Sequence, residues 1–207
     1  LLCREFRDGL DALQPAYVPA DTLQEGDYLL LPRPQHGRCR VEPAFARLVG
    51  WIGSEGYIGE TGIIQFTFSS KNQADIASVT ACLQENGLHA GIHVRDDGLT
   101  MVSAQSVALC RELSRYVTGT YNNKRLTGQV LTWNAAALHE LLTAYIDGDG
   151  SVARGHHLGK LRLRSSSPAM LAILADIVRA LGLPVTVNCD SPAGKPMQSP
   201  TNGKTYY

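Results

Sequence analysis

The sequence predicts an α+β fold in which one αββα-like unit with antiparallel strands occurs twice. Three observations support this prediction: stretches of the chain recur about 94 residues apart, apolar residues recur with helical spacing, and other segments alternate apolar with polar residues. The 207 residues are 44% hydrophobic, which is enough for a substantial core. No apolar run reaches the roughly 18 residues that a membrane helix needs.

The repeat lies in two pairs of segments. LVGWIGSEGYI, residues 48–58, aligns with LTAYIDGDGSV, residues 142–152, at an offset of 94. Residues 71–92 align with residues 166–187 at an offset of 95, so one residue inserted between the pairs reconciles them. Because acidic residue, glycine and helical spacing agree in order, we interpret the repeat as a duplication.

Each copy predicts the same elements in the same order. An apolar helix is expected over 45–54 and again over 138–148, each ending at an acid–glycine step that suits a helix C-terminus. An alternating strand follows, IIQFTFSS in one copy and KLRLRSS in the other. In KLRLRSS, one face is expected to be apolar and packed and the other cationic. An amphipathic helix closed by Gly87 or Gly182 completes the pattern.

The first copy continues beyond this pattern. IHVRDDGLTMVSA predicts a hairpin that turns at Asp97-Gly98, and SAQSVALCRELSRYV predicts a second helix. We therefore divide the chain into an N-terminal segment and linker, 1–42, a first half, 43–136, and a second half, 137–207.

Both repeated apolar helices carry small residues three or four positions apart, which let two helix backbones approach closely. These are Gly50, Gly53, Ala144 and Gly148. A close seam between the helices would bring their C-terminal ends together, and with them Glu55 and Asp149.

Two carboxylates at two negative helix ends repel one another, and cations between them would compensate for this repulsion. Hard divalent cations take carboxylate and backbone oxygens, and paired metals at a phosphodiester are a route to hydrolysis. A calcium loop is excluded, because the sixth and twelfth positions counted from Asp147 are Val152 and Leu158. A plain Asp-Gly turn stays open for either acid alone, but it does not account for the duplication.

LTAYIDGDG resembles the LAGLIDADG motif of homing endonucleases, and LVGWIGSEG resembles a degenerate first copy of it. The likeness covers about residues 43–207 and is closest to the two-motif, single-chain subgroup often found inside inteins. It implies two pseudo-symmetric αββαββα halves whose antiparallel, saddle-shaped sheets straddle duplex DNA. It also implies a DNA-binding nuclease, a hydrolase that cuts phosphodiesters with Mg²⁺ or another divalent cation.

The resemblance also implies roles for individual residues. The implied metal ligands are the carboxylates of Glu55 and Asp149 and the backbone carbonyls of Ser54 and Gly148. Lys124, in NNKRLTG, matches the position of a lysine near the family's active site and would polarise the phosphate or the attacking water, with Arg125 as the fallback. A solvated charged pair in a loop is the alternative for these two residues.

The strands after each motif supply candidate DNA-binding residues. They are Gln65, Thr67 and Ser69 in the first half and Lys160, Arg162 and Arg164 in the second. Arginine and lysine suit guanine and phosphate, and glutamine suits adenine, in the major groove. Alternation alone fits an ordinary solvated strand face equally well.

The N-terminal stretch VPADTLQEGDYLLLPRP resembles the part of an intein or Hint-type splicing domain that leads into its endonuclease insert. Since the chain begins at Leu1, we expect an excised piece of a longer protein, with flanking splicing segments as partners. Five scattered cysteines without a C-x-x-C pair suit free thiols in a reducing, cytoplasmic compartment.

The second half is expected to be short at its C-terminus, because the equivalent of Lys124 would fall at position 218, beyond Tyr207. Our prediction is a monomeric, site-specific endonuclease of a long asymmetric duplex site, the homing endonuclease region of an intein. Two alternatives stay open: a non-cleaving nucleic-acid binder, such as an RNA maturase or a DNA-binding regulator, and a structural fragment that takes part in protein splicing.

Overall fold

The computed structural model describes residues 17–25, 35–152 and 161–188 and four two-residue strands at 2–3, 28–29, 197–198 and 205–206. The chain forms two compact units, 1–35 and 36–207. In the first unit, β1 (Leu2–Cys3) pairs antiparallel with β2 (Tyr28–Leu29), and a 3-10 turn, η2, covers Ala20–Thr22.

The second unit begins with the complete αββαββα order that the resemblance implies. Its elements are α1 (Pro43–Ser54), β3 (Gly56–Ile58), β4 (Ile63–Ser69), α2 (Gln73–Glu85), β5 (Gly91–Val94), β6 (Leu99–Gln105) and α3 (Val107–Leu113). The four strands form one antiparallel sheet in the order β3-β4-β6-β5. The α+β class with antiparallel sheets is therefore confirmed.

A connecting region leads to the second copy. It contains β7 (Val117–Thr118), η3 (Tyr121–Asn123), β8 (Arg125–Leu126) and η4 (Gly128–Thr132). The second copy then contains α4 (Ala135–Asp149), β9 (Gly150–Val152), β10 (Leu161–Leu163) and α5 (Pro168–Ala180), and β11 (Met197–Gln198) pairs with β12 (Thr205–Tyr206). Strands β9 and β10 form an antiparallel pair, so the αββα part of the repeat occurs twice.

The helices begin where the sequence supplies start signals. Pro43 and Pro168 stand at the first positions of α1 and α5, where the missing N–H of proline costs nothing. The Asn134 side chain accepts from the amide of Ala137 at 2.9 Å, so α4 starts three residues earlier than expected. Helices α2 and α5 each have 13 residues and begin 95 residues apart, which confirms the duplicated register.

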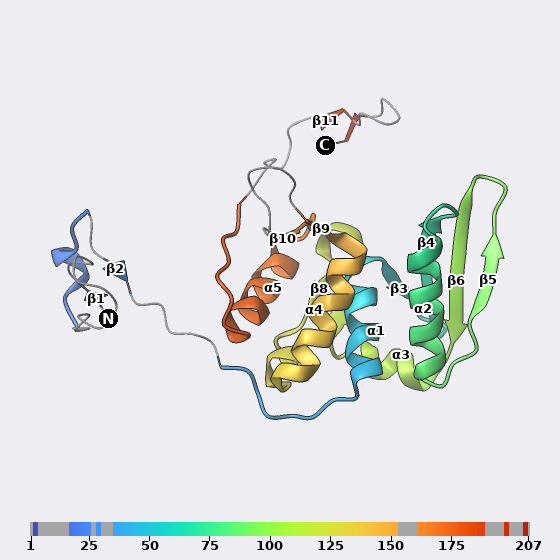
Figure 1. The fold of residues 1–207 in the computed structure, drawn as a ribbon, viewed down its shortest axis with the longest axis horizontal. Helices are drawn as coiled ribbons and strands as arrows, with labels where there is room; N and C mark the ends of the chain where they lie inside the picture. The colour runs from blue at the N-terminus through green and yellow to red at the C-terminus, as the bar shows by residue number, and fades with distance from the viewer. Residues whose placement is uncertain are drawn as a thin grey trace. The chain divides into compact units, whose positions relative to one another are not determined.

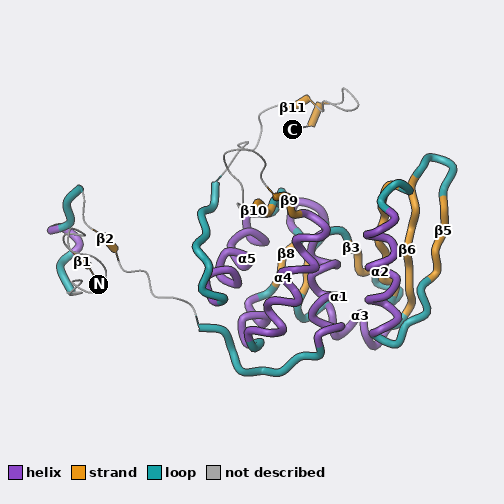
Figure 2. Tube along the Cα trace, viewed as in Figure 1, coloured by secondary structure: helices purple, strands orange, loops and turns teal. Residues whose placement is uncertain are grey.

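The helices lie in a row, α5, α4, α1 and α2, with the four-stranded sheet at one end of the row (Figures 1 and 2). Helix α1 is central: it contacts α4 along its length, and it also contacts α2 and β3 (Figure 1). The inward face of β4 buries Ile64, Phe66 and Phe68, and the Trp51 ring of α1 meets Phe68 edge-on at 6.2 Å. One continuous apolar core therefore joins the sheet to the helix seam.

The second helix of the first half is shorter than predicted. The expected segment began at Ser103, but Ser103 lies in β6 and pairs with Gln65. The Ser106 side chain accepts from the amide of Leu109 and starts α3 at Val107. The hairpin prediction holds, because the turn between β5 and β6 places Gly98 at φ +79°.

The predicted linker around residue 37 is anchored by backbone hydrogen bonds. The amides of Gly37 and Cys39 donate to the carbonyls of Leu131 and Thr132, and Asn134 donates back to Cys39. Within the described residues, Cys39 is exposed while Cys82 and Cys110 are buried, and all three thiols are free. In the same part of the chain, every helix is too short or too polar to cross a bilayer.

Candidate active site at the ends of two paired helices

The seam between α1 and α4 is a backbone-to-backbone contact. A Cβ on Gly50 would lie 2.2 Å from the carbonyl oxygen of Leu141 and 2.9 Å from the Cβ of Ala144. Farther along, a Cβ on Gly53 would lie 3.3 Å from the buried ring of Tyr145. Gly50, Gly53 and Ala144 thus lie at the contact between the two helices, and Ala144 is 2% exposed.

The same seam delivers the two acidic residues to one place. At its end, a Cβ on Gly148 would lie 2.3 Å from Ser54 Oγ and 3.2 Å from the Cγ of Glu55. Gly148 directly precedes Asp149, the last residue of α4, and Glu55 directly follows the last residue of α1. The two helix ends therefore present Glu55 and Asp149 side by side.

The glycine after each acid serves close packing rather than a left-handed turn. A Cβ on Gly56 would lie 2.7 Å from the Cα of Ile52 and from the Phe66 ring, and one on Gly150 would lie 2.3 Å from the carbonyl oxygen of Ile146. Gly56 and Gly150 are absent from the glycines with positive φ, and Gly150 is extended at φ −93°. The chain folds straight back over each helix end into a strand, which leaves no room for a side chain.

Both acids are half-buried, and their electrostatics follow from that position. Burial raises the pKa of Glu55, and the neighbouring charge of Asp149 raises it further. Burial also raises the pKa of Asp149. The Lys124 ammonium opposes both shifts, because a nearby positive charge favours the ionised carboxylates.

Lys124 reaches the site from the β7–β8 connection. Its Nζ donates to three backbone carbonyls, those of Ile52 at 3.1 Å, Ser54 at 2.9 Å and Gly56 at 3.0 Å. Burial lowers the pKa of Lys124, while Asp149 and Glu55 raise it. Arg125, the fallback candidate, is exposed and pairs in β8 with Thr118.

Two further residues belong to this environment, although sequence reasoning did not select Asp75 and left Asp147 without a catalytic or ligand role. Asp75, in the first turn of α2, raises the pKa of Glu55 and of the exposed Asp147 through its charge. The only sequence signal for Asp75 is an acid in a first helical turn, which normally indicates stabilisation of that helix end. Its closeness to the site depends on how α2 packs against α1.

The donor chemistry at the helix ends fits a divalent cation of the magnesium type. Such ions are usually held by one or two carboxylates, with waters and substrate phosphate completing the shell. Glu55 and Asp149 supply two carboxylates, and no cluster of three or more acidic, histidine or cysteine ligands occurs in the described ranges. The arrangement suits a metal shared with a bound phosphate better than a closed structural site.

The predicted DNA-binding residues of the first half lie on one face of the sheet, away from the core. Gln65 is partly exposed and Thr67 and Ser69 are exposed, while their neighbours along β4 are buried. The strand register extends this face to residues that the sequence did not single out: Tyr57 and Ser103 flank Gln65, and Met101 pairs with both Thr67 and His93.

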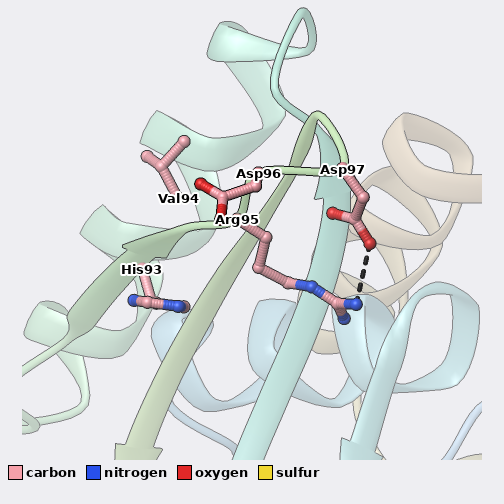
Figure 3. A pocket seen from close by; sticks show the side chains of 5 residues that line it. All are labelled: His93, Val94, Arg95, Asp96 and Asp97. Carbon is pink, nitrogen blue, oxygen red and sulfur yellow. Dashed lines mark ion pairs between the residues drawn. The ribbon is translucent and has the colours of Figure 1, made fainter.

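The tip of the β5–β6 hairpin carries a shallow depression at the edge of the same sheet (Figure 3). Arg95 crosses the surface and forms an ion pair with Asp97 at 2.7 Å, and His93 projects on the other side of the strand from Val94 (Figure 3). Both partners of the ion pair are about half exposed, so it is a surface contact of small stabilising effect.

In the second half, Arg162 and Arg164 are exposed on and next to β10, and Lys160 lies outside the described residues. The leucine face of this strand packs only in part, since Leu163 contacts the core while Leu161 is 46% exposed. The expectation of a packed apolar face on β10 was therefore wrong for Leu161. The carbonyl of Arg164 accepts from the Tyr145 hydroxyl at 3.1 Å, which ties β10 to α4.

Comparison with known proteins gives relatives by sequence and by fold. No protein family model matches the chain. It is 27% identical over 195 residues to iron–sulfur cluster assembly SufBD family proteins of Mycobacterium tuberculosis and Mycobacterium bovis. The alignment covers 89% of this chain but only 23% of those proteins, so the chain spans about a quarter of their length.

Among solved structures, the chain is similar to the homing endonuclease I-DmoI. The structure of I-DmoI in complex with DNA and Mn matches over 72% of this chain and 83% of that chain, with 17% identity and a TM-score of 0.51. Structures of mesophilic variants of the same enzyme match over 72% and 77%, with a TM-score of 0.52. The chain therefore has the fold of LAGLIDADG homing endonucleases.

Proposed function

We propose that this chain binds duplex DNA and hydrolyses its phosphodiesters with a divalent metal held by Glu55 and Asp149. The observation that carries the proposal is the meeting of the two half-buried carboxylates at the ends of α1 and α4, one from each copy of the repeat. A structural role alone does not explain why two like charges are brought together, because their repulsion and desolvation cost stability. A metal ion between them offsets that cost.

The metal would be Mg²⁺ or a similar ion, and it would neutralise charge on the phosphate and lower the pKa of a bound water. The protein's own contribution is to hold Glu55 and Asp149 at fixed positions on two rigid helices, with Gly148 allowing the close approach. The carbonyl of Gly148 is a further candidate oxygen ligand. The related I-DmoI has been crystallised with DNA and either Mn or Ca, which supports a divalent cation here.

DNA would lie along the polar faces of the strands. Gln65, Thr67 and Ser69 supply neutral hydrogen-bonding groups suited to base edges, and Arg162 and Arg164 supply positive charge suited to phosphates and guanine. Because the formal net charge of the whole chain is zero, phosphate binding would depend on such local basic groups. We expect a monomer to bind a long asymmetric site, since the two halves differ in sequence.

The chain is further proposed to be the endonuclease region of an intein. Its curated relatives are named for iron–sulfur cluster assembly, yet the aligned segment is only 23% of their length. A segment with an endonuclease fold within a protein named for another task fits an inserted region. The splicing-domain resemblance of residues 18–34 supports the same context, with the flanking splicing segments as partners.

A plasmid library with random inserts tests the function, because it offers the protein many candidate target sequences at once. Incubated with Mg²⁺, the wild-type protein should linearise a subset of plasmids that share a sequence, and Asp149→Asn should bind the same sequence without cutting it. Failure of the wild type to bind or cut any member of the library contradicts the proposal.

Binding without cleavage by both proteins would favour the second candidate, a nucleic-acid binder that kept the fold. One observation favours this candidate: the Ser54 carbonyl, an expected metal ligand, already accepts a hydrogen bond from Lys124.

A further inference from the structure

The Lys124 ammonium has no N–H group left for a substrate. An ammonium has three donors, and those of Lys124 go to the carbonyls of Ile52, Ser54 and Gly56 at 2.9 to 3.1 Å. A lysine that polarises a phosphate or a water needs a donor directed at that group. The geometry therefore points to a different role from the one that the family resemblance implies.

The three carbonyls surround Glu55. Ile52 and Ser54 belong to the last turn of α1, where carbonyls lack intrahelical partners and the helix end is negative. Gly56 is the first residue of β3. One ammonium thus ties the helix end to the strand on both sides of the acid and fixes the backbone from which the Glu55 side chain projects.

Lys124 is itself held by a rigid connection. It directly precedes β8, and the β7–β8 pair is anchored by Val117 and Leu126, which are 5% and 1% exposed. Before it, Gly119 has φ +76°, and a Cβ there would lie 2.3 Å from the carbonyl oxygen of Asn123. The side chain of Asn123 accepts from the amide of Thr120 at 2.7 Å and closes this turn.

We propose that Lys124 is a positioning residue that holds the turn between α1 and β3 in place. Its ammonium also occupies the Ser54 carbonyl oxygen, where a metal ion would otherwise bind. A divalent ion at this site is then held by the carboxylates of Glu55 and Asp149 without the Ser54 carbonyl. The inference deepens the proposed function, since it assigns the ligands of that same site. It also explains how two carboxylates coexist there before any metal binds.

The test measures two properties of the full chain without DNA: its thermal unfolding temperature without metal and its affinity for Mn²⁺. Lys124→Met should lower the unfolding temperature by about 4 °C or more, because three partly buried hydrogen bonds are lost. The same variant should bind Mn²⁺ about threefold or more tightly, since it removes a positive charge and releases the Ser54 carbonyl. A purely structural lysine would lower stability without raising Mn²⁺ affinity.

Two further variants complete the design. Lys71→Met removes an exposed lysine in the turn before α2 and should change neither property. Lys124→Arg keeps the charge but presents its N–H groups as a planar fork. It should therefore lower the unfolding temperature, and it should raise the Mn²⁺ affinity less than Lys124→Met does. If Lys124→Met does not fold, Lys124→Arg carries the test.

The proposed role of Lys124 is contradicted if the Lys124 variants unfold at the wild-type temperature. It is also contradicted if Lys124→Met binds Mn²⁺ no more tightly than the wild type. Asp149→Asn, measured in parallel, separates this outcome from failure of the proposed function. Unchanged Mn²⁺ binding in Asp149→Asn removes the metal site, whereas the effect of Lys124 on unfolding stands independently of it.

Discussion

The acid and the glycine at each helix end have separate physical roles. Glu55 and Asp149 are half-buried at one site, which raises the pKa of each. Gly56 and Gly150 make that placement sterically feasible, because the strand after each acid turns back against its own helix. The repeated acid–glycine pair in the sequence therefore marks a tight helix-to-strand turn that carries an acidic side chain.

The backbone contact at Gly50 predicts a loss of stability when this residue gains a side chain. Gly50→Ala puts a Cβ 2.2 Å from the backbone carbonyl of Leu141, so the helices must separate. We expect a loss of about 1–3 kcal/mol in the free energy of unfolding, measured by chemical denaturation. Gly128→Ala is the matched control, since a Cβ at exposed Gly128 meets nothing within 4 Å and should be neutral. Equal stability of both variants would show that the helices do not touch at Gly50.

The two acids also predict an unusual pH dependence for the metal-free protein. Their folded pKa values lie above the ordinary values of 4.5 for Glu55 and 3.8 for Asp149. Between the ordinary and the raised pKa values, the folded state therefore binds more protons than the unfolded state. The stability of the folded state consequently rises as pH falls through this range.

In a chelator-treated sample, the unfolding temperature should rise as pH is lowered from neutrality toward 4.5, the ordinary pKa of a glutamate. Asp149→Asn removes one of the two half-buried charges, so it should be more stable than the wild type at pH 7 and show a smaller rise on acidification. Calorimetry checks both statements. A less stable Asp149→Asn protein at pH 7 would mean that the carboxylate is favourably paired in the folded state.

The polar faces of β4 and β10 are expected to bind DNA in different ways. Gln65 lies in the row formed with Tyr57 and Ser103 across the sheet, as suits contact with base edges. Arg162 is exposed on β10 opposite Ser151, as suits contact with phosphates. A phosphate contact acts on every sequence and adds to the salt dependence of binding, whereas a base contact discriminates among sequences.

Gln65→Ala should therefore weaken binding to the selected duplex by about 1–3 kcal/mol and leave a scrambled duplex unaffected. Arg162→Ala should weaken both and reduce the slope of affinity against salt concentration by about one ion. Fluorescence anisotropy at several salt concentrations distinguishes the two patterns. Uniform behaviour of Gln65→Ala on both duplexes would remove this strand from sequence recognition.

Most elements were predictable from the sequence, because periodicity and caps are local signals. The repeated helices, the alternating face of β4 and the turn at Gly98 all follow from residues near one another in the chain. The extent of α3 was mispredicted because Ser103 lies in β6 and pairs with β4. The packing of β10 was overestimated because Leu161 is 46% exposed. Both errors concern tertiary contacts that local pattern does not contain.

The two acids of the candidate site could be selected from the sequence for a different reason. The duplication identified Glu55 and Asp149 together, since each acid occupies the same place in its copy. The bonding of Lys124 was not accessible, because its three carbonyl partners lie 68 to 72 residues earlier in the chain. The proximity of Asp75 likewise arises from the packing of α2 against α1.

The duplication brings the C-terminal ends of α1 and α4 to the same place. Helices α1 and α4 form the seam. Arg47 of α1 pairs across it with Glu140 of α4 at 2.8 Å, and it also pairs with Glu85 of α2 at 2.6 Å. These ion pairs are partly exposed and contribute little individually, so the seam depends chiefly on backbone contact at Gly50 and Gly148. Any activity at the helix ends requires both halves at once.

A double-mutant cycle on Mn²⁺ affinity tests most directly whether Glu55 and Asp149 hold one ion. Glu55→Gln, Asp149→Asn and the double variant are titrated with Mn²⁺ and followed by electron paramagnetic resonance. If both acids hold one ion, each single substitution should abolish most of the binding, and the double variant should lose little more than either. Independent, additive losses, or full binding in either single variant, would contradict a common metal site.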